Sequence, residues 1–317
     1  MLRVFNRSAS KLALAAMLIF TSVSTAAVAA PSTTVAKKIT VTDFAGRSIT
    51  FDKPVNSVVT LAAGDAQIVA ALGGNLVGRP KTSNTKLPKA VLDAAVIGSA
   101  HTPNYELITA LKPELIIGSK NLNVKDVKAL EATGAKVFLT NSESVKEIKE
   151  SVLKMGQLLG KYERAKATVQ AMDVKLQLAA KINKDNPKKA LIVYGAPGTL
   201  LAAMPDSLPG DLLTKAGGKN VAADFPKMEK MSGYAQLSAE RVIASNPDVV
   251  FLITHGDPDA VKKAFDAEIS KNASWSSLTA VKKGHIIILP SHLFGTNPGT
   301  KIFDSLQVLA THLKEAE

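Results

Sequence analysis

The sequence predicts an α/β protein of two lobes, each built on a parallel-rich sheet, joined by one long helix. Short apolar strand-like runs alternate with helical segments in both halves of the chain. Between the halves, roughly 40 residues show only helical periodicity. One motif (helix, proline, acidic residue, apolar strand) occurs once in each half. The 317 residues suffice for two ordinary domains.

The composition is that of a folded globular protein, with 46% hydrophobic and 21% charged residues. The chain contains no cysteine. This excludes thiol catalysis, thiolate metal sites, disulfides and lipid attachment through a cysteine.

The first 29 residues have the layout of a secretory signal peptide. Arg3, Arg7 and Lys11 precede the apolar run 12–20, and Ala27-Val28-Ala29 forms an A-x-A cleavage site. The apolar run is short for a membrane span of about 20 residues. We therefore expect cleavage near Ala29 and a soluble protein outside the cytoplasm.

Cleavage would lower the formal net charge from +12 to +9. The lysines are spread along the chain, and no stretch interleaves arginines with aromatic residues. The sequence thus favours a solvated basic surface over a nucleic-acid interface.

The first lobe is predicted over 38–142. It begins with a hairpin around Ala45-Gly46-Arg47 and continues with alternating strands and helices. The predicted strands are 39–42, 48–51, 55–61, 76–78, 115–118 and 136–139, and the predicted helices are 65–72, 107–111 and 124–133.

The linking helix is predicted over 143–184, where apolar residues recur every three or four positions and no proline occurs between 144 and 182. A continuous helix of roughly 40 residues would be about 60 Å long and would bridge two domains.

The second lobe is predicted over 188–317 and repeats the alternation. The predicted strands are 190–194, 249–253 and 285–289, and the predicted helices are 211–216, 238–245, 259–269 and 301–314.

The repeated motif makes the two lobes similar. Residues 105–117 and 239–251 both read helix, proline, acidic residue, strand, with Glu106 and Glu240 at the same offset. Two lobes built alike enclose a cleft, where ligands usually bind.

These features resemble the class III solute-binding proteins of ABC importers, whose fold has two Rossmann-like lobes joined by one long α-helix. The second lobe looks closest to the haem receptor of the iron-regulated surface determinant system. The stretches that carry this resemblance are Gly195-Ala196-Pro197-Gly198, Gly210-Asp211-Leu212-Leu213, Ala216-Gly217-Gly218-Lys219-Asn220, His255-Gly256-Asp257-Pro258-Asp259, and 264–271 followed by Trp275 and Ala280-Val281-Lys282. The resemblance implies a monomer that carries haem (iron-protoporphyrin) to a dimeric permease.

The chain departs from this family in two respects. It lacks the lipobox cysteine, so it is expected to move freely in a periplasm or be released. In the loop 98–103, His101 stands where the family's first-lobe iron ligand is typically a methionine.

The resemblance makes His255 one iron ligand, and His101 is the expected opposing ligand. His255 directly follows the strand 249–253, at the carboxyl end where α/β sheets bind ligands. Two imidazoles on opposite haem faces would leave no open coordination site, which suits carriage.

Other residues are expected around the haem. Leu61, Ala62 and Ala63 would face the apolar ring. The candidates for the propionates are Arg79, Lys81 and Ser83. Met231 and Tyr234, expected in the loop before the helix 238–245, and His292, in the loop after the last strand, are candidate contacts or replacement ligands. His285 and His312 are expected to be structural or solvated.

Glu106 and Glu240 each begin a helix, where the helix dipole alone favours a carboxylate. In the family, one such glutamate per lobe docks onto permease arginines, and we expect that role here.

No catalytic motif is recognisable. Within the same class, a siderophore or cobalamin receptor is the alternative. Asp257 and Asp259 beside His255 leave a secreted metal-dependent hydrolase as an alternative of another class.

Overall fold

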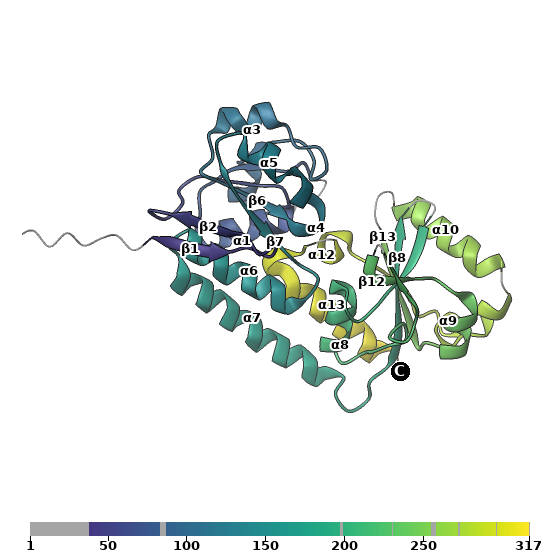
Figure 1. Cartoon of the computed structure of the whole chain (residues 1–317). Coiled ribbons are helices and arrows are strands. Elements are labelled where there is room, and N and C mark those ends of the chain that lie inside the picture. The colour runs from purple at the N-terminus through teal and green to yellow at the C-terminus, as the bar shows by residue number, and fades with distance from the viewer. Residues whose placement is uncertain are drawn as a thin grey trace, which may run out of the picture. The chain divides into compact units, whose positions relative to one another are not determined.

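The computed structural model describes residues 38–82, 87–196, 199–229, 231–254, 258–271, 273–295 and 297–316. The expected signal peptide, Ser83 and His255 lie outside these residues. The chain divides into the units Met1–Ala36 and Lys37–Glu317, and the following concerns the second unit (Figure 1).

The first lobe contains a five-stranded sheet in which every strand pair is parallel. The strand order is β5 (Ala95–Val96), β4 (Leu76–Arg79), β3 (Val58–Thr60), β6 (Leu115–Ser119), β7 (Lys136–Thr140). The central strand β3 is buried throughout, as is typical of parallel sheets covered on both faces. The helical segments are α1 (Ala63–Ala71), α2 (Lys89–Leu92), α3 (Tyr105–Leu111), α4 (Lys120–Asn123), η1 (Val124–Asp126) and α5 (Val127–Glu131). The predicted hairpin is confirmed as β1 (Ile39–Thr42) and β2 (Ser48–Phe51).

The second lobe has a mixed sheet. Its order is β11 (Lys227–Met228), β12 (Met231–Gln236), β9 (Thr199–Ala203), β8 (Lys189–Ala196), β13 (Val249–Thr254), β14 (Ile286–Leu289), with β10 (Lys219–Asn220) also pairing with β8. Strands β8, β13 and β14 are parallel, as predicted. Strands β9, β12 and β11 are antiparallel additions. Met231 and Tyr234 therefore lie on strand β12 and not in a loop, which corrects the expectation.

The remaining helices of the second lobe connect and cover these strands. They are α8 (Leu208–Lys215), α9 (Ala239–Ser245), α10 (Pro258–Lys271), η2 (Ala273–Ser277), α11 (Thr279–Lys282), α12 (Ser291–Phe294), η3 (Gly299–Lys301) and α13 (Ile302–Glu315).

The linking segment is a pair of antiparallel helices, α6 (Val145–Leu158) and α7 (Tyr162–Ile182). The chain turns at Gly160, whose φ of 64° is readily adopted only by glycine. A Cβ on Gly156 would lie 2.4 Å from the Cβ of Ala165, so this glycine allows the close approach of the two helices. The fold class is confirmed, but the single continuous helix is wrong, because a left-handed glycine folds the segment back.

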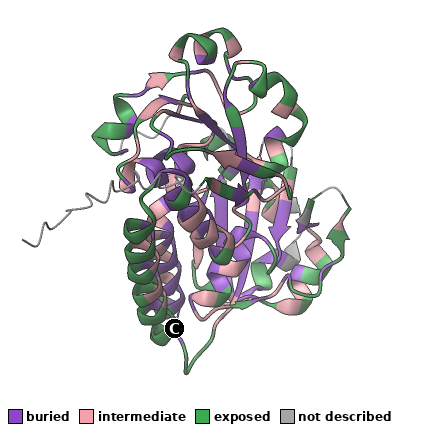
Figure 2. Cartoon of the chain, turned by 60° about the vertical axis from the view of Figure 1, so that its left-hand side comes forward, coloured by how far each residue is buried: buried purple, intermediate pink, exposed green. Residues whose placement is uncertain are grey.

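One hydrophobic core spans both lobes. It includes Ile68 and Phe138 from the first lobe, Ile192 from the second, Met172 from α7 and Leu306 from α13. Helix α13 packs against both α7 and α8. Figure 2 shows these buried residues running between the sheets and the helices. Because the lobes share this core, we expect the hinge motion between them to be small.

Helices α3 and α9 have matching ends. The side chain of Asn104 accepts a hydrogen bond from the N–H of Leu107, and Ser238 accepts one from Arg241 in the same position. Each helix ends on a left-handed residue, Lys112 with φ 46° and Asn246 with φ 42°. Within the described residues, these are the non-glycine positions with positive φ.

The acidic residues of the repeated motif also have matching roles. The carboxylate of Glu114 accepts a hydrogen bond from the N–H of Asn56 at 2.6 Å, and that of Asp248 accepts one from Lys189 at 2.8 Å. Each acid thus fixes the start of the neighbouring strand. The internal repeat seen in the sequence is therefore a structural repeat.

Searched over the residues that the structure describes, no helix is both long and apolar enough to span a membrane.

Candidate functional site

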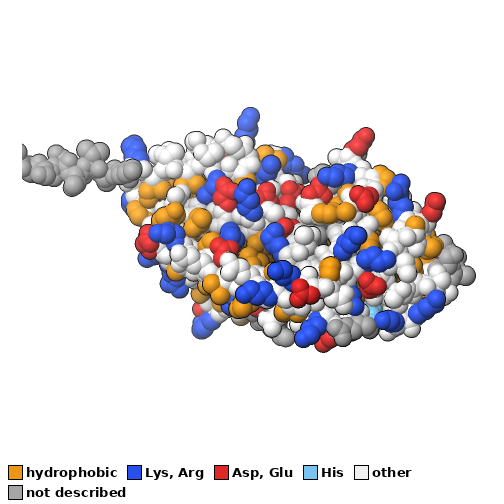
Figure 3. All heavy atoms as spheres, turned by 90° about the horizontal axis from the view of Figure 1, so that it is seen from below, with side chains coloured by type: hydrophobic (Ala, Val, Ile, Leu, Met, Phe, Trp, Pro, Cys, Tyr) orange, Lys and Arg blue, Asp and Glu red, His pale blue; other side chains and the backbone are white. Residues whose placement is uncertain are grey.

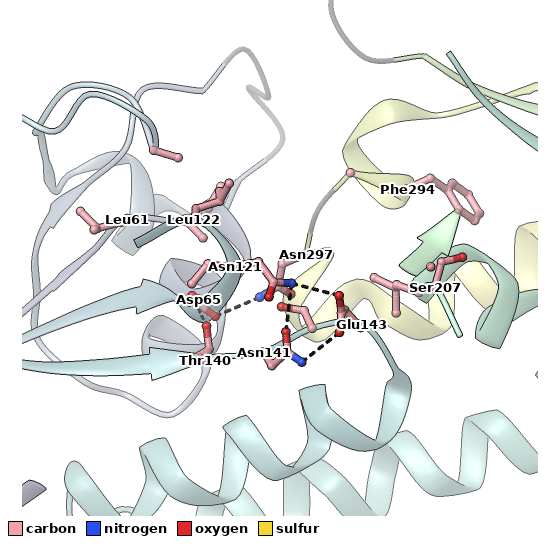
Figure 4. Close-up of a pocket in the computed structure, with 18 of the residues that line it drawn as sticks. Leu61, Asp65, Asn121, Leu122, Thr140, Asn141, Glu143, Ser207, Phe294 and Asn297 are labelled. Atoms are coloured by element: carbon pink, nitrogen blue, oxygen red, sulfur yellow. Dashed lines mark hydrogen bonds between the residues drawn. The ribbon is translucent and has the colours of Figure 1, made fainter. Parts of the chain in front are cut away.

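A pocket of about 640 Å³ lies between the lobes (Figure 4). The first lobe contributes the segments that follow β3, β4, β6 and β7. The carboxyl ends of parallel strands meet at one sheet edge, which is where open α/β sheets bind ligands. The volume falls within the range of small-molecule and cofactor sites.

The first-lobe side of the pocket is mostly polar. Asn121 donates a hydrogen bond to the carboxylate of Glu143 at 3.0 Å, and Asn141 donates to the same carboxylate at 3.2 Å. Asn141 also donates to Glu147 on α6 at 2.9 Å. These bonds link the segments after β6 and β7 (Figure 4). These hydrogen bonds therefore fix the amides and carboxylates relative to one another.

Asp65 forms the buried floor of the pocket. It is fully buried, and its carboxylate accepts hydrogen bonds from Thr140 at 3.1 Å and from Asn297 at 2.9 Å. Burial raises the pKa of Asp65 from 3.8 to about 7, although both hydrogen bonds favour the ionised form. Asn297 belongs to the segment before η3, so this bond ties α1 to the C-terminal part of the chain.

The packing around this tie is tight. A Cβ on Gly64 would lie 2.3 Å from the carbonyl oxygen of Asn297. Gly299, with φ 60°, approaches Gly64 from the same segment. The pocket floor is therefore a close-packed junction between the lobes.

The second-lobe side of the pocket is aromatic and aliphatic. The rings of Tyr194 and Tyr234 lie 5.4 Å apart at a tilt of 56°. Burial raises the pKa of both phenols, so both stay protonated at neutral pH. The other lining residues of this side are Ser207, Leu208, Pro209, Met231, Gly233, Phe294, Gly295 and Asn297. This side offers a surface for a flat apolar ligand.

Most of the predicted pocket residues that can be located do line it. Leu61, Ala62 and Ala63 follow β3 and line its first-lobe side. Lys81 lines it after β4, and its side chain is exposed. Met231 and Tyr234 line it from β12.

Three predicted residues are not among those that line the pocket. The two terminal nitrogens of the Arg79 guanidinium donate to the carbonyls of Pro80 and Leu92. His292 is half-buried on α12. His101 is exposed, but its neighbour Ala100 does line the pocket.

The predicted ligand His255 and the predicted propionate contact Ser83 lie outside the described residues. His255 follows Thr254, the last residue of β13, which pairs with Gly195 next to the pocket residue Tyr194. Within the described residues, no group of three or more His, Asp or Glu side chains is placed to hold a metal ion.

The sequence analysis missed much of the polar floor. Ser119, Thr140 and Asn141 end or follow buried strands, and that position is a signal that could have found them. Asn297 gave no such signal, because it meets Asp65 from 232 positions away in the sequence.

Two α/β lobes around a pocket at their strand ends define a binding protein, and the family comparison agrees. Residues 58–293 match the model of the periplasmic binding protein family. The chain belongs to this family, whose members are extracellular or periplasmic solute-binding proteins and not enzymes. The metal-dependent hydrolase is thereby set aside.

Among individual proteins, the chain is similar to the high-affinity heme uptake system protein IsdE of Staphylococcus aureus, strain Newman. The two are 30% identical over 223 residues, 69% of this chain and 74% of IsdE. The crystal structure of S. aureus IsdE complexed with heme covers 81% of this chain and 98% of its own, with a TM-score of 0.71 and 26% identity. The crystal structure of an ABC transporter substrate-binding protein from Listeria monocytogenes EGD-e covers 83% of this chain and 100% of its own. Its TM-score is 0.72, at 26% identity.

The periplasmic vitamin B12 binding protein BtuF of Vibrio cholerae shares the fold. Its TM-score is 0.64 at 22% identity, with 83% of this chain and 98% of its own covered. At this identity, the similarity shows a shared fold.

Proposed function

We propose that the protein captures haem in the pocket between its lobes and delivers it to the permease of an ABC importer. The observation that carries this proposal is the pocket itself, with an aromatic and aliphatic wall formed by Tyr194, Tyr234 and Phe294. A porphyrin is a flat, apolar ring that would pack against such a wall. The similarity to a heme uptake protein supports the choice of ligand.

In this proposal, His255 and His101 are the axial iron ligands. His255 follows the strand β13, beside the segment that carries Tyr194. His101 lies in a loop whose carbonyl at Ala100 accepts a hydrogen bond from Asn123 at 3.3 Å. The exposed imidazole of His101 would turn inward over its pocket-lining neighbour Ala100. Lys81 would bind a propionate.

Glu106 and Glu240 would dock the protein onto the permease. Both carboxylates are exposed, and neither forms an ion pair with a described residue. The helices that they begin run opposite to the parallel strands that follow. Both glutamates would then lie at the carboxyl-end edges of the sheets, where ligands bind.

The proposal includes export: residues 1–29 would be removed as a signal peptide, and the protein would act in the periplasm or after release. The monomer would bind one haem.

The first test is a visible-absorption titration of the protein with ferric haem, beside His255→Ala and His101→Ala. His312→Ala is the matched control, because His312 lies on α13 and contacts Glu315. We expect a saturable one-to-one low-spin spectrum that becomes high-spin or is lost in His255→Ala and is unchanged in the control. An unchanged spectrum in His101→Ala would move the second ligand to Met231 or Tyr234. No saturable binding would overturn the haem proposal.

A second test separates docking from binding. Glu106→Gln and Glu240→Gln should leave haem affinity unchanged but lower haem-stimulated ATP hydrolysis by the cognate transporter. Asp185→Asn is the charge-matched control, because Asp185 is exposed and lies in the segment between α7 and β8. Equal stimulation by all variants would argue against this docking surface.

A second candidate within the class is a receptor for a ferric siderophore or cobalamin. The observation favouring it is the polar lining of the first-lobe side, where Asn121, Asn141 and Glu143 face the pocket. Asparagine amides and carboxylates suit amide-rich or cationic ligands better than two propionates. Parallel titrations with cobalamin and a ferric hydroxamate distinguish these ligands from haem.

A further inference from the structure

Helix α7 carries apolar residues on two opposite sides. Its inner side is buried through Ala165, Met172 and Ala179, spaced by seven residues. Its outer side carries four apolar residues, Ala167, Ala171, Val174 and Leu178, here called the outer stripe. At about 100° per residue, the outer stripe lies opposite the buried row.

The outer stripe is uncovered in the described chain. Val174 and Leu178 are 57% and 59% exposed, and Ile182 continues the exposed apolar surface at 42%. Figure 2 shows exposed residues along the outer side of α7, and Figure 3 shows hydrophobic and basic side chains intermingled over the underside of the molecule. A surface helix of a globular protein normally has one apolar side, facing the core, and a polar opposite side, so the outer stripe is a departure from that pattern.

We propose that the outer stripe is a self-association surface, on which the α7 helix of a second copy packs in antiparallel orientation. The stripe has spacings of four, three and four residues, the pattern of a coiled-coil seam. Its small residues come first and its large residues last. An antiparallel pair would therefore place Ala167 against Leu178 of the second copy, and Ala171 against Val174. A parallel pair would place large side chains against large ones and leave gaps between the alanines.

The charges at the two ends of α7 favour the same orientation. Glu163 and Lys181 lie on the same flank of the outer stripe, near opposite ends of the helix. In the antiparallel pair, each Glu163 would lie near Lys181 of the second copy. A parallel pair would instead place the two residues at opposite ends of the seam, out of reach of each other.

The existing contacts of these two residues permit this exchange. Lys181 has no ion-pair partner among the described residues. Glu163 pairs with Lys166 at 3.1 Å, and its side chain is 83% exposed. Exposed pairs of this kind contribute little to stability, so Glu163 can change partner at small cost.

The dimer would be weak and compatible with ligand binding. One helix pair buries less area than a standard stable interface, so association should depend strongly on concentration. None of the described residues that line the pocket comes from α7. The monomer therefore remains the unit that binds ligand.

Sedimentation velocity of the protein up to about 1 mM tests the proposal. We expect a reversible monomer–dimer equilibrium that Leu178→Glu weakens by about tenfold or more. Glu163→Lys and Lys181→Glu should each weaken it, and the double variant should restore it. Asp185→Lys, an exposed change outside the stripe, is the control. Circular dichroism confirms that each variant is folded.

Cross-linking tests the orientation, because the chain has no cysteine to interfere. A171C mixed with V174C should form a mixed disulfide dimer faster than either variant alone. Faster linking of V174C to itself would overturn the antiparallel arrangement. A monomer at every concentration would overturn the proposal, as would self-association unaffected by Leu178→Glu. Binding of the stripe to anionic lipid vesicles without self-association would also overturn it.

Discussion

The two lobes share a scaffold but present opposite chemistry to the pocket. The repeat of cap, left-handed residue and strand-anchoring acid is the same in both, from Asn104 to Glu114 and from Ser238 to Asp248. The pocket surfaces differ, with hydrogen-bonded amides on one side and the pair Tyr194–Tyr234 on the other. The repeat therefore builds and orients each lobe, while the residues beyond the strand ends determine what binds.

The lobes also differ in how they are tied together. Asp65 of the first lobe is bound by Asn297, and Asp211 of the second lobe accepts a hydrogen bond from the N–H of Val145 at the start of α6 at 2.8 Å. Asp65 is fully buried, whereas the side chain of Asp211 also pairs with Lys215 and is 18% exposed. Desolvation of a carboxylate therefore destabilises the contact of Asp65 with Asn297 more than the contact of Asp211 with Val145.

The largest expected effect comes from removing that buried charge with Asp65→Asn. The folded-state pKa of about 7 exceeds the ordinary value of 3.8. The folded protein thus holds this proton more tightly, and stability is lost as the pH rises from about 4 to 7, by up to about 4 kcal/mol. The variant should lack this loss and be more stable than the parent at pH 8. An amide fits the site, since it accepts from Asn297 and can donate to Thr140, whose hydroxyl also donates to Gly118.

Urea unfolding of both proteins between pH 4 and pH 8 measures this difference. Asp52→Asn is the control, because Lys38 lowers the pKa of this exposed carboxyl. Identical pH profiles for the parent and Asp65→Asn would show that Asp65 is not buried as a titrating group.

The next effect tests the packing of the same tie. In Gly64→Ala, the new Cβ would meet the carbonyl oxygen of Asn297 at 2.3 Å and its Cγ at 2.5 Å. Separating these segments should cost about 3 kcal/mol of unfolding free energy. Gly134→Ala is the matched control, with open space around the Cβ but φ of 94°, and should cost about 1–2 kcal/mol. Equal losses in thermal unfolding would mean that the junction is loose.

Sequence reasoning predicted what local pattern determines. The hairpin, the parallel strands β6, β7, β8, β13 and β14, and the repeat containing Glu106 and Glu240 all follow from periodicity and from proline and glycine positions. The break of the linking helix at Gly160 was missed, because a glycine in a helical pattern is ambiguous until the packing of α6 on α7 requires φ above zero.

The pocket was predicted less completely for a different reason. Leu61, Ala62 and Ala63 were found because they follow a strand and the family resemblance places an apolar ring there. Asp65 and Asn297 were not found, because their contact exists only after the chain's last segment returns to α1. Strand β12 was missed since its residues Met231 to Gln236 include a glycine and polar side chains, which weaken any alternating pattern.

The smallest effect sharpens the similarity of the lobes. Asn104→Ala and Ser238→Ala each remove one N-cap hydrogen bond, from the N–H of Leu107 and of Arg241. Each should cost about 1 kcal/mol of unfolding free energy, with equal losses if the two motifs are energetically equivalent. Ser119→Ala should cost much less, because the side chain at this N-cap makes no capping hydrogen bond. The bond at Ser238 is longer, 3.4 Å against 2.9 Å at Asn104, so if the two losses differ, the loss in Asn104→Ala should be the larger. A larger loss at Ser238 than at Asn104 would show that the repeat is geometric but not energetic.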